Sequence, residues 1–518
     1  MRNMVWLLVV MLSIRLTAQA QPGLGVERDS LFATFSLFKD SLEAVAASGD
    51  AAGLDALWQA LKDADQVPYV HDDSVAFLYR GAANQVAWNG DFNGWGGAGN
   101  VASEGTRLGG SDVWMLEHAF PADARIDYKI VLNGSQWILD PANPRQQWSG
   151  FGPNSALLMP AYVYPQETIP RPDGPRGTLS GTIRISSAKL GYAVNYRVYT
   201  PAGYDTLAGL ATLYVTDGHE YADDRLGSAR IVLDNTIADG LIPSILAVFI
   251  DPREPGNAGN NRRQSQYADD YATFAAFLTD ELVPAIDSTY KIQPSPERRG
   301  ILGTSLGGLF SAYLGAAHSG VFGCIGIHSP AFRYDTQRNQ DRVYRMYTEA
   351  DRLPLKLFMS TGTLFDTLPE TRRMRQVFED KGYPLQYIEV NEGHSWGNWR
   401  ALIDDPLRFC WSADVNVGIG EAVTPDDLAP GAGFELTSYP NPFRSEATIA
   451  FRLPLAQRVS LEVYNVLGRR VQTLLDRIPF AAGAHTVTVA TPPWPSGLYL
   501  YRLTSEARAA TGQMVLVR

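Results

Sequence analysis

The chain has 518 residues, of which 45% are hydrophobic and 19% are charged, and its formal net charge is −11. This composition provides enough apolar residues for globular cores and excludes a wholly disordered chain, while the acidic balance argues against a non-specific nucleic-acid binder and against docking on anionic lipid. With only 2 cysteines, a disulfide-rich scaffold and a cysteine-rich zinc site are excluded. The length predicts three or four domains.

The first 20 residues have the order of a secretory signal peptide. Arg2 precedes an apolar run over residues 4–12, and Ala18-Gln19-Ala20 forms an A-x-A cleavage pattern. Arg15 keeps the run too short to span a membrane, and no later segment reaches that length. We therefore expect residues 1–20 to be removed and the mature chain to be soluble and exported.

A helical lead-in is predicted over residues 21–70. Apolar residues recur at helical spacing over residues 31–38 and again over residues 54–61, and Ser48-Gly49-Asp50 separates the two stretches. The pattern predicts a helical hairpin that packs on its neighbours.

Residues 71–165 form short apolar runs with a period of two, separated by turns rich in Gly and Asn. This pattern predicts a small immunoglobulin-like β-sandwich. The segments GDFNGW (90–95), YKIVLNGSQW (128–137) and LDPANP (139–144) resemble the glycogen-binding type of carbohydrate-binding module. The resemblance implies a sugar platform built from Trp95, Lys129, Trp137 and Asn154.

The physical basis of such a platform is that flat aromatic rings stack on the C–H faces of sugars while polar neighbours bind the hydroxyls. Two interpretations stay open. Either the sandwich binds a glycan, or it is a docking domain whose tryptophans belong to its core.

Residues 175–412 alternate apolar strands with helical stretches. Runs such as 211–215, 245–250 and 355–359 are apolar at nearly every position, which is typical of a parallel sheet covered on both faces. The predicted fold class is α/β, with an α/β-hydrolase catalytic domain flanked by two small all-β sandwich domains.

A candidate nucleophile lies in the G-x-S-x-G motif at residues 303–307. The motif follows the predicted strand 300–302 and precedes the predicted helix 309–314, which is the strand–turn–helix context that this motif requires. Small residues at 303 and 307 allow Ser305 to adopt a strained backbone conformation with its hydroxyl exposed. We therefore predict that Ser305 is the nucleophile.

A serine hydroxyl needs a base, and the base needs an acid that orients it. His394 follows the last predicted strand, 387–390, and Asp366 follows the strand 355–359, so both lie at strand ends and in the chain order Ser, acid, His. We predict that His394 is the base and Asp366 the acid. His328 is a weaker rival for the base, and Glu370 is the runner-up for the acid.

An oxyanion hole requires two backbone N–H groups. One is expected from Leu306, directly after the nucleophile, and the other from Gly218 or His219 in the loop after the strand 213–216. No metal and no cofactor is needed for this chemistry.

The α/β segment also resembles a known family. The residues that carry the likeness are 213–218, 280–286, 303–308, 362–366 and 393–400. They are similar to the esterase family that includes esterase D, enterochelin esterase and the feruloyl and acetyl-xylan esterases of carbohydrate esterase family 1. The resemblance implies a serine carboxyl-ester hydrolase that works through an acyl-enzyme.

Three functions are weighed for the whole chain. The glycan-type sandwich and the surface-export domain favour hydrolysis of feruloyl or acetyl esters on external polysaccharide. The runner-up is hydrolysis of a siderophore ester. The third function, a non-catalytic glycan-binding surface protein, is disfavoured by the complete Ser–Asp–His set. The segment 252–263 is expected to border the pocket, where its arginines either hold an anionic substrate or are solvated loop charges.

The C-terminal part begins with a linker. Residues 413–433 are rich in small residues and have no periodicity, and residues 434–518 again alternate as in a short-stranded sandwich. This last segment resembles the C-terminal sorting domain of the type IX secretion system. The resemblance implies the type IX machinery as a partner, translocation across an outer membrane, and a secreted or surface-attached product.

The two cysteines, Cys324 and Cys410, are expected to fill core space as small apolar residues. A disulfide between them stays open, because sequence alone does not place their Cα atoms.

Overall fold

A computed structural model of the chain describes residues 30–411 and most of the segment 435–517. The described C-terminal segments are 435–443, 446–453, 457–465, 470–480, 483–490, 494, 497–505 and 509–517. The predicted signal peptide and the linker 413–433 lie outside the described residues. The chain divides into two compact units, residues 1–414 and residues 415–518. Within the described ranges, no helix is both long and apolar enough to cross a membrane.

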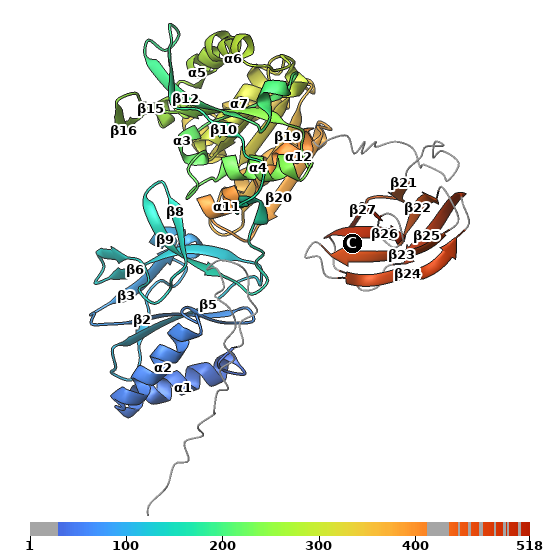
Figure 1. The fold of residues 1–518 in the computed structure, drawn as a ribbon. Helices are drawn as coiled ribbons and strands as arrows, with labels where there is room; N and C mark the ends of the chain where they lie inside the picture. Colours follow the sequence, from blue (N-terminus) through green and yellow to red (C-terminus); the bar gives the residue numbers. More distant parts are fainter. Residues whose placement is uncertain are drawn as a thin grey trace, which may run out of the picture. The chain divides into compact units, whose positions relative to one another are not determined.

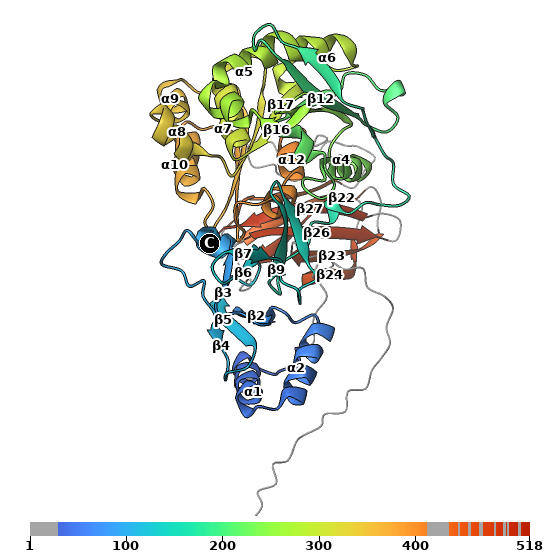
Figure 2. The same cartoon turned by 90° about the vertical axis from the view of Figure 1, so that its left-hand side faces the viewer.

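The first described elements are the helices α1 (Phe35–Ser48) and α2 (Ala51–Asp63). The side chains of Thr34 and Asp50 cap their N-termini by accepting hydrogen bonds from backbone N–H groups in the first turns. Phe38 and Leu61 share a buried cluster with Leu78 of the neighbouring sheet. The predicted helical hairpin is thus confirmed, and it lies at the end of the sandwich away from the α/β part (Figures 1 and 2).

Two antiparallel sheets form the first sandwich. One sheet has the order β1-β2-β5-β4, and the other has the order β3-β6-β9-β8 with β7 paired to β6. Their strands are β1 (Tyr69–His71), β2 (Ser74–Arg80), β3 (Val86–Gly90), β4 (Thr106–Arg107), β5 (Val113–Ala119), β6 (Arg125–Leu132), β7 (Gln136–Ile138), β8 (Gln146–Ser149) and β9 (Gly152–Leu158). Phe77, Trp88 and Tyr128 pack between the sheets. The period-two pattern therefore predicted this sandwich correctly.

The α/β part is built on one mixed sheet in the order β10-β12-β14-β13-β17-β18-β19-β20, with β11 paired to β12. The six strands from β14 to β20 in this order are parallel, and β12 is antiparallel to β14. The strands are β10 (Thr178–Leu179), β11 (Ile183–Ser186), β12 (Ala193–Thr200), β13 (Ala211–Val215), β14 (Ile245–Asp251), β17 (Arg299–Thr304), β18 (Cys324–His328), β19 (Lys356–Gly362) and β20 (Leu385–Val390).

Helices cover both faces of this sheet (Figure 1). Along β13, Tyr214 belongs to one buried cluster while Leu213 and Val215 belong to another, so the strand buries both its faces. This confirms the predicted covered parallel sheet. The helices are α3 (Gly218–Tyr221), α4 (Ala229–Ala238), α5 (Tyr271–Phe277), α6 (Val283–Thr289), α7 (Leu306–Ala317), α8 (Phe332–Asn339), α9 (Arg342–Glu349), α10 (Leu368–Asp380), α11 (Trp396–Arg400) and α12 (Asp404–Trp411).

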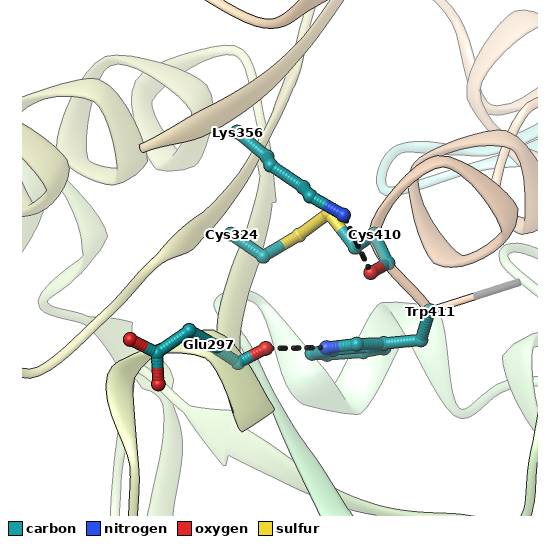
Figure 3. The surroundings of a disulfide bond; sticks show 5 residues. All are labelled: Glu297, Cys324, Lys356, Cys410 and Trp411. Atoms are coloured by element: carbon teal, nitrogen blue, oxygen red, sulfur yellow. Dashed lines mark hydrogen bonds between the residues drawn. A yellow bond between two sulfur atoms is a disulfide. The ribbon is translucent and has the colours of Figure 1, made fainter. Parts of the chain in front are cut away.

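Cys324 of β18 and Cys410 of α12 form a disulfide (Figure 3). The two residues therefore do not act as separate apolar thiols, because the fold brings their Cα atoms to 6.0 Å, within bonding reach. Next to the bridge, Trp411 Nε1 donates a hydrogen bond to the carbonyl of Glu297 at 3.0 Å. The bridge attaches α12 to β18, and the hydrogen bond attaches it to the turn at residues 296–298, just before β17.

The second compact unit is an all-antiparallel pair of sheets. One sheet has the order β21-β22-β25 and the other β24-β23-β26-β27. The strands are β21 (Glu435–Tyr439), β22 (Glu446–Leu453), β23 (Gln457–Asn465), β24 (Arg470–Phe480), β25 (Gly483–Ala490), β26 (Gly497–Ser505) and β27 (Ala509–Leu516). Phe451, Leu461 and Tyr501 share its core. The predicted C-terminal sandwich is confirmed for these residues.

Candidate active site

Ser305 lies at a sharp turn between β17 and α7, with φ 56° and ψ −116°. A positive φ is strained for a residue with a side chain, and such strain occurs most often at functional sites. Two glycines make the turn possible. A Cβ on Gly303 would collide with the carbonyl of Gly307, and a Cβ on Gly307 would collide with Thr216. The small residues that the motif requires are thus explained by packing.

His394 meets Ser305 from the loop that follows β20. Its Nε2 lies 2.9 Å from Oγ of Ser305, and its Nδ1 lies 2.6 Å from Oδ1 of Asp366. The imidazole is 35% exposed, and the carboxylate of Asp366 is fully buried. The structure therefore joins the three predicted side chains in one hydrogen-bonded series, whose central imidazole is partly open to solvent.

Asp366 is held by further donors. Its Oδ2 accepts hydrogen bonds from Ser329 Oγ at 2.5 Å and from the N–H of Gly362 at 2.6 Å. Burial alone would raise the pKa of Asp366, but the hydrogen bonds from His394, Ser329 and Gly362 outweigh it and lower that pKa. Asp366 is therefore ionised at neutral pH and can stabilise an imidazolium.

Ser329 is a site residue that the sequence did not predict. It is fixed in turn by Trp399, whose Nε1 donates to Ser329 Oγ at 2.9 Å and whose ring stands edge-on to His394 with centroids 4.9 Å apart. Ser329 directly follows β18, which lies between β17 and β19, so the rule that parallel-strand ends build the site is the signal that could have found it.

The rival candidates do not join this series. His328 is buried, its Nδ1 lies 2.8 Å from Ser360 Oγ, and burial lowers its pKa to about 3. Only its carbonyl contacts the nucleophile, by accepting from the N–H of Ser305. Glu370 lies in the first turn of α10, where an acid is favourable to the helix.

The predicted oxyanion donors lie at the starts of two helices, α3 and α7. Leu306 is the first residue of α7, and Gly218 and His219 begin α3. The N–H groups of a first helical turn have no intrahelical acceptor and remain available. Gly218 has no room for a side chain, because a Cβ there would collide with the backbone of Phe249. The His219 ring lies 3.5 Å from Asp251, and burial lowers its pKa.

The arginines of the segment 252–263 have partners within the chain. The segment forms the hairpin β15 (Arg253–Glu254) and β16 (Asn257–Asn261). Arg253 pairs with Asp251 at 2.7 Å, and Arg262 pairs with Glu254 at 3.3 Å. Arg263 Nε contacts both carboxylate oxygens of Asp217, at 2.8 and 2.9 Å, and its Nη2 donates to the carbonyl of Thr304. Arg263 thus ties the residue before Gly218 to the residue before Ser305.

The four sandwich positions of the predicted sugar platform differ in exposure. Trp137 of β7 is 48% exposed, whereas Asn154 of β9 is only 4% exposed. Lys129 and Trp95 are half-buried. Trp95 lies in the turn η1 (Asp91–Gly96). The strand register puts Lys129, Trp137 and Asn154 on the sheet face that points away from the sandwich core.

No group of three or more His, Cys, Asp or Glu side chains in the described ranges is arranged to hold a metal ion.

Two family models match the chain. Residues 187–410 match the family described as "Putative esterase", and residues 437–517 match the one described as "Secretion system C-terminal sorting domain". The first match contains all three residues of the hydrogen-bonded series, and the second covers the C-terminal sandwich.

Relatives and solved structures extend the likeness. The chain is 22% identical over 240 residues to "Uncharacterized protein YjcH" of Bacillus subtilis, covering 44% of this chain and 97% of that protein. It is 25% identical over 356 residues to the iron(III) enterobactin esterase of Dickeya dadantii. This match covers 60% of this chain and 79% of that protein.

The enterobactin esterase of Shigella flexneri, solved in the presence of enterobactin, shares the fold. Its TM-score is 0.54 at 20% identity, over 65% of this chain and 92% of that one. This coverage is larger than residues 187–410, so the shared fold extends beyond the esterase segment.

Proposed function

We propose that the chain is an exported serine carboxyl-ester hydrolase. The observation that carries the proposal is the series Ser305 Oγ, His394 Nε2, His394 Nδ1 and Asp366 Oδ1, with contacts of 2.9 and 2.6 Å. A hydroxyl, a base and an orienting acid in this geometry are what nucleophilic acyl transfer needs.

In the proposed reaction, Ser305 Oγ attacks the ester carbonyl while His394 Nε2 takes its proton. The N–H of Leu306 and that of Gly218 or His219 stabilise the oxyanion. His394 then gives the proton to the leaving alcohol, and an acyl-enzyme remains on Ser305. Water, deprotonated by His394, attacks the acyl group and releases the acid.

The test is the variant Ser305→Ala, assayed with p-nitrophenyl esters. We expect hydrolysis to fall to background, while Ser288→Ala, which removes an exposed serine hydroxyl of α6, keeps the wild-type rate. Hydrolysis retained by Ser305→Ala would refute the assignment.

Export is part of the proposal. The match to a secretion sorting domain over residues 437–517 and the signal-peptide pattern of residues 1–20 together support a route through the type IX system to the surface or the medium. Deleting residues 434–518 should leave the protein in the periplasm, and fractionation of the expressing cells would measure this.

Two substrate classes follow from the architecture. Feruloyl or acetyl esters of external polysaccharide are favoured by the resemblance of the sandwich to a glycan-binding module. A siderophore-type ester is favoured by the shared fold with an enterobactin esterase over 65% of the chain, and by the burial of Asn154 in the proposed sugar platform. Release of ferulate or acetate from polysaccharide, compared with opening of a catecholate trilactone, separates the two.

A non-catalytic glycan-binding protein is the competing function. It predicts that the wild-type chain is pulled down by insoluble xylan or starch and that Trp95→Ala/Trp137→Ala abolishes the pull-down. The esterase proposal instead predicts Ser305-dependent hydrolysis whether or not the pull-down succeeds.

A further inference from the structure

Four charged side chains are buried where the sandwich meets the loop that carries His394. They are Asp91 of η1, Arg125 and Asp127 of β6, and Glu392. Arg125 Nη2 donates to Asp127 Oδ1 at 2.7 Å, and Arg125 Nη1 donates to Glu392 Oε2 at 3.3 Å. Asp91 Oδ2 accepts from the N–H of Asp127 at 2.9 Å. We call these four residues the Arg125 cluster, and it joins two parts of the chain that are far apart in sequence.

Backbone and side-chain bonds beside the cluster fix the same loop. The N–H of Arg125 donates to the carbonyl of Asn391 at 3.1 Å. Nδ2 of Asn391 donates to Asp123 Oδ1 at 2.7 Å. Both Asn391 and Glu392, the third and second residues before His394, are therefore held by sandwich residues 123–125.

The loop is also shaped to receive these side chains. A Cβ on Gly393 would collide with the carboxyl of Asp91, and a Cβ on Gly397 would collide with the guanidinium of Arg125. A glycine thus lies on each side of His394, where a sandwich side chain packs directly against the backbone of the loop or of the start of α11. Such close approach is a common reason for a glycine outside a turn.

The sandwich also supports the loop that carries Asp366, the acid of the hydrogen-bonded series. The N–H of Leu364 donates to the carbonyl of Glu392 at 3.1 Å, and Thr363 Oγ1 donates to Asn391 Oδ1 at 2.8 Å. Leu364 packs against the core of the sandwich. The loop with Asp366 and the loop with His394 are therefore bonded to each other and are both supported by the sandwich.

The charges make this support sensitive to the loss of Arg125. Three buried carboxyl groups surround one guanidinium, and removing the cation of a buried ion pair leaves uncompensated charge. Burial raises the pKa of Asp91, of Asp127 and of Glu392, and Arg125 opposes this shift at each of them. Arg125 is thus the residue on which the packing of the other three depends.

We propose that the sandwich is a working part of the catalytic centre, and that Arg125 is a positioning residue that holds the loop of His394 against Ser305 and Asp366. The proposal rests on the proposed esterase function of Ser305 and His394. The proposal gives the sandwich a role in positioning His394, and this role is independent of whether the sandwich binds a ligand.

The test compares full-length Arg125→Met with the wild type in steady-state ester hydrolysis. We expect kcat to fall about 10- to 100-fold with KM nearly unchanged, because a shift of about 1 Å in a catalytic group costs that much while substrate contacts stay in place. Arg125→Lys restores the positive charge but offers one nitrogen in place of the two that contact Asp127 and Glu392, so it should recover part of the lost kcat.

Arg80→Met is the matched control. Arg80 of β2, in the same sandwich, pairs with Asp55 of α2 and with Asp112. We expect it to lower the melting temperature but to leave kcat unchanged. If Arg125→Met keeps the wild-type kcat, or if Arg80→Met lowers kcat equally, the sandwich is only structural support and the positioning role is wrong.

Where Arg125→Met does not fold, Glu392→Gln decides the question. Because burial raises the pKa of Glu392 to about 7, the assay is run at pH 8, where this carboxyl is ionised. Gln keeps the shape but removes the charge that faces Arg125, and we expect a several-fold lower kcat at unchanged KM. An unchanged kcat in this variant overturns the proposal. Failure of the esterase function itself is distinguishable, because then the wild-type chain shows no hydrolysis that depends on Ser305.

Discussion

Oδ1 of Asp366 lies 2.6 Å from Nδ1 of His394, and the carboxylate that makes this contact is fully buried. Its second oxygen is occupied by Ser329 and by the N–H of Gly362. The carboxylate is therefore fixed in position as well as ionised, and it selects the tautomer in which His394 presents an unprotonated Nε2 to Ser305.

Replacing Asp366 by Asn should lower kcat by about 10³-fold or more, because the amide favours the wrong tautomer and does not stabilise an imidazolium. Steady-state hydrolysis of a p-nitrophenyl ester measures the effect. Glu370→Gln serves as the control, since Glu370 is the runner-up acid in the sequence analysis and lies outside the hydrogen-bonded series. If Glu370→Gln were the inactive variant and Asp366→Asn the active one, the acid would have to be reassigned.

Gly307→Ala should inactivate the enzyme and destabilise it by about 1–3 kcal/mol, because the new Cβ collides with Thr216 at the base of the nucleophile turn. Gly320→Ala is the control, since nothing lies within 4 Å of its Cβ position. Thermal melts and ester hydrolysis of both variants provide the comparison. Wild-type activity in Gly307→Ala would show that the turn tolerates a side chain and that the packing argument fails.

Most of the fold was predictable because it depends on local pattern. Apolar residues at nearly every position of β13 and β14 indicate strands that are buried on both faces. In β2, Val75, Phe77 and Tyr79 point into the sandwich core, as their spacing of two predicts. Ala76 and Leu78 on its other face are buried too, because they pack with the helical hairpin. Ser305, Asp366 and His394 were predictable from the order of strand ends, and the structure brings their side chains into hydrogen-bonding distance.

The remaining features depend on contacts between residues far apart in the chain. Arg125 and Glu392 are 267 residues apart, and nothing near either one indicates a buried partner. The pairing of Cys324 with Cys410 likewise follows from where α12 crosses the sheet, which composition and spacing do not reveal. Ser329 belongs to no recognisable sequence motif. It contacts Asp366 because it follows β18, the strand that lies between β17 and β19.

Removing the disulfide with Cys324→Ala/Cys410→Ala should destabilise the α/β part by up to about 4 kcal/mol, since the bridge closes a loop of 86 residues and limits the unfolded chain. Chemical denaturation of the purified variant measures the loss. A reducing agent should lower the stability of the wild type and leave that of the double variant unchanged. Equal stability of the two proteins without reductant would mean that the bridge contributes nothing in solution.

Glu392→Gln should change how stability depends on pH. Burial raises the pKa of Glu392 from 4.5 to about 7, with Arg125 opposing the shift. Between these two values the folded protein keeps a proton that the unfolded chain releases. This group therefore contributes stability in full below pH 4.5 and loses the contribution as the pH rises through 7, an effect of up to about 3 kcal/mol.

The amide of the variant does not titrate, so the variant should gain in melting temperature relative to the wild type as the pH rises from 5 to 8. Asp91, Asp123, Asp127 and Arg125, which face Glu392, are present in both proteins, so the difference between the two melting curves isolates Glu392. A difference that stays constant over this range would mean that Glu392 is already ionised at pH 5 and that the cluster carries more negative charge than the geometry implies.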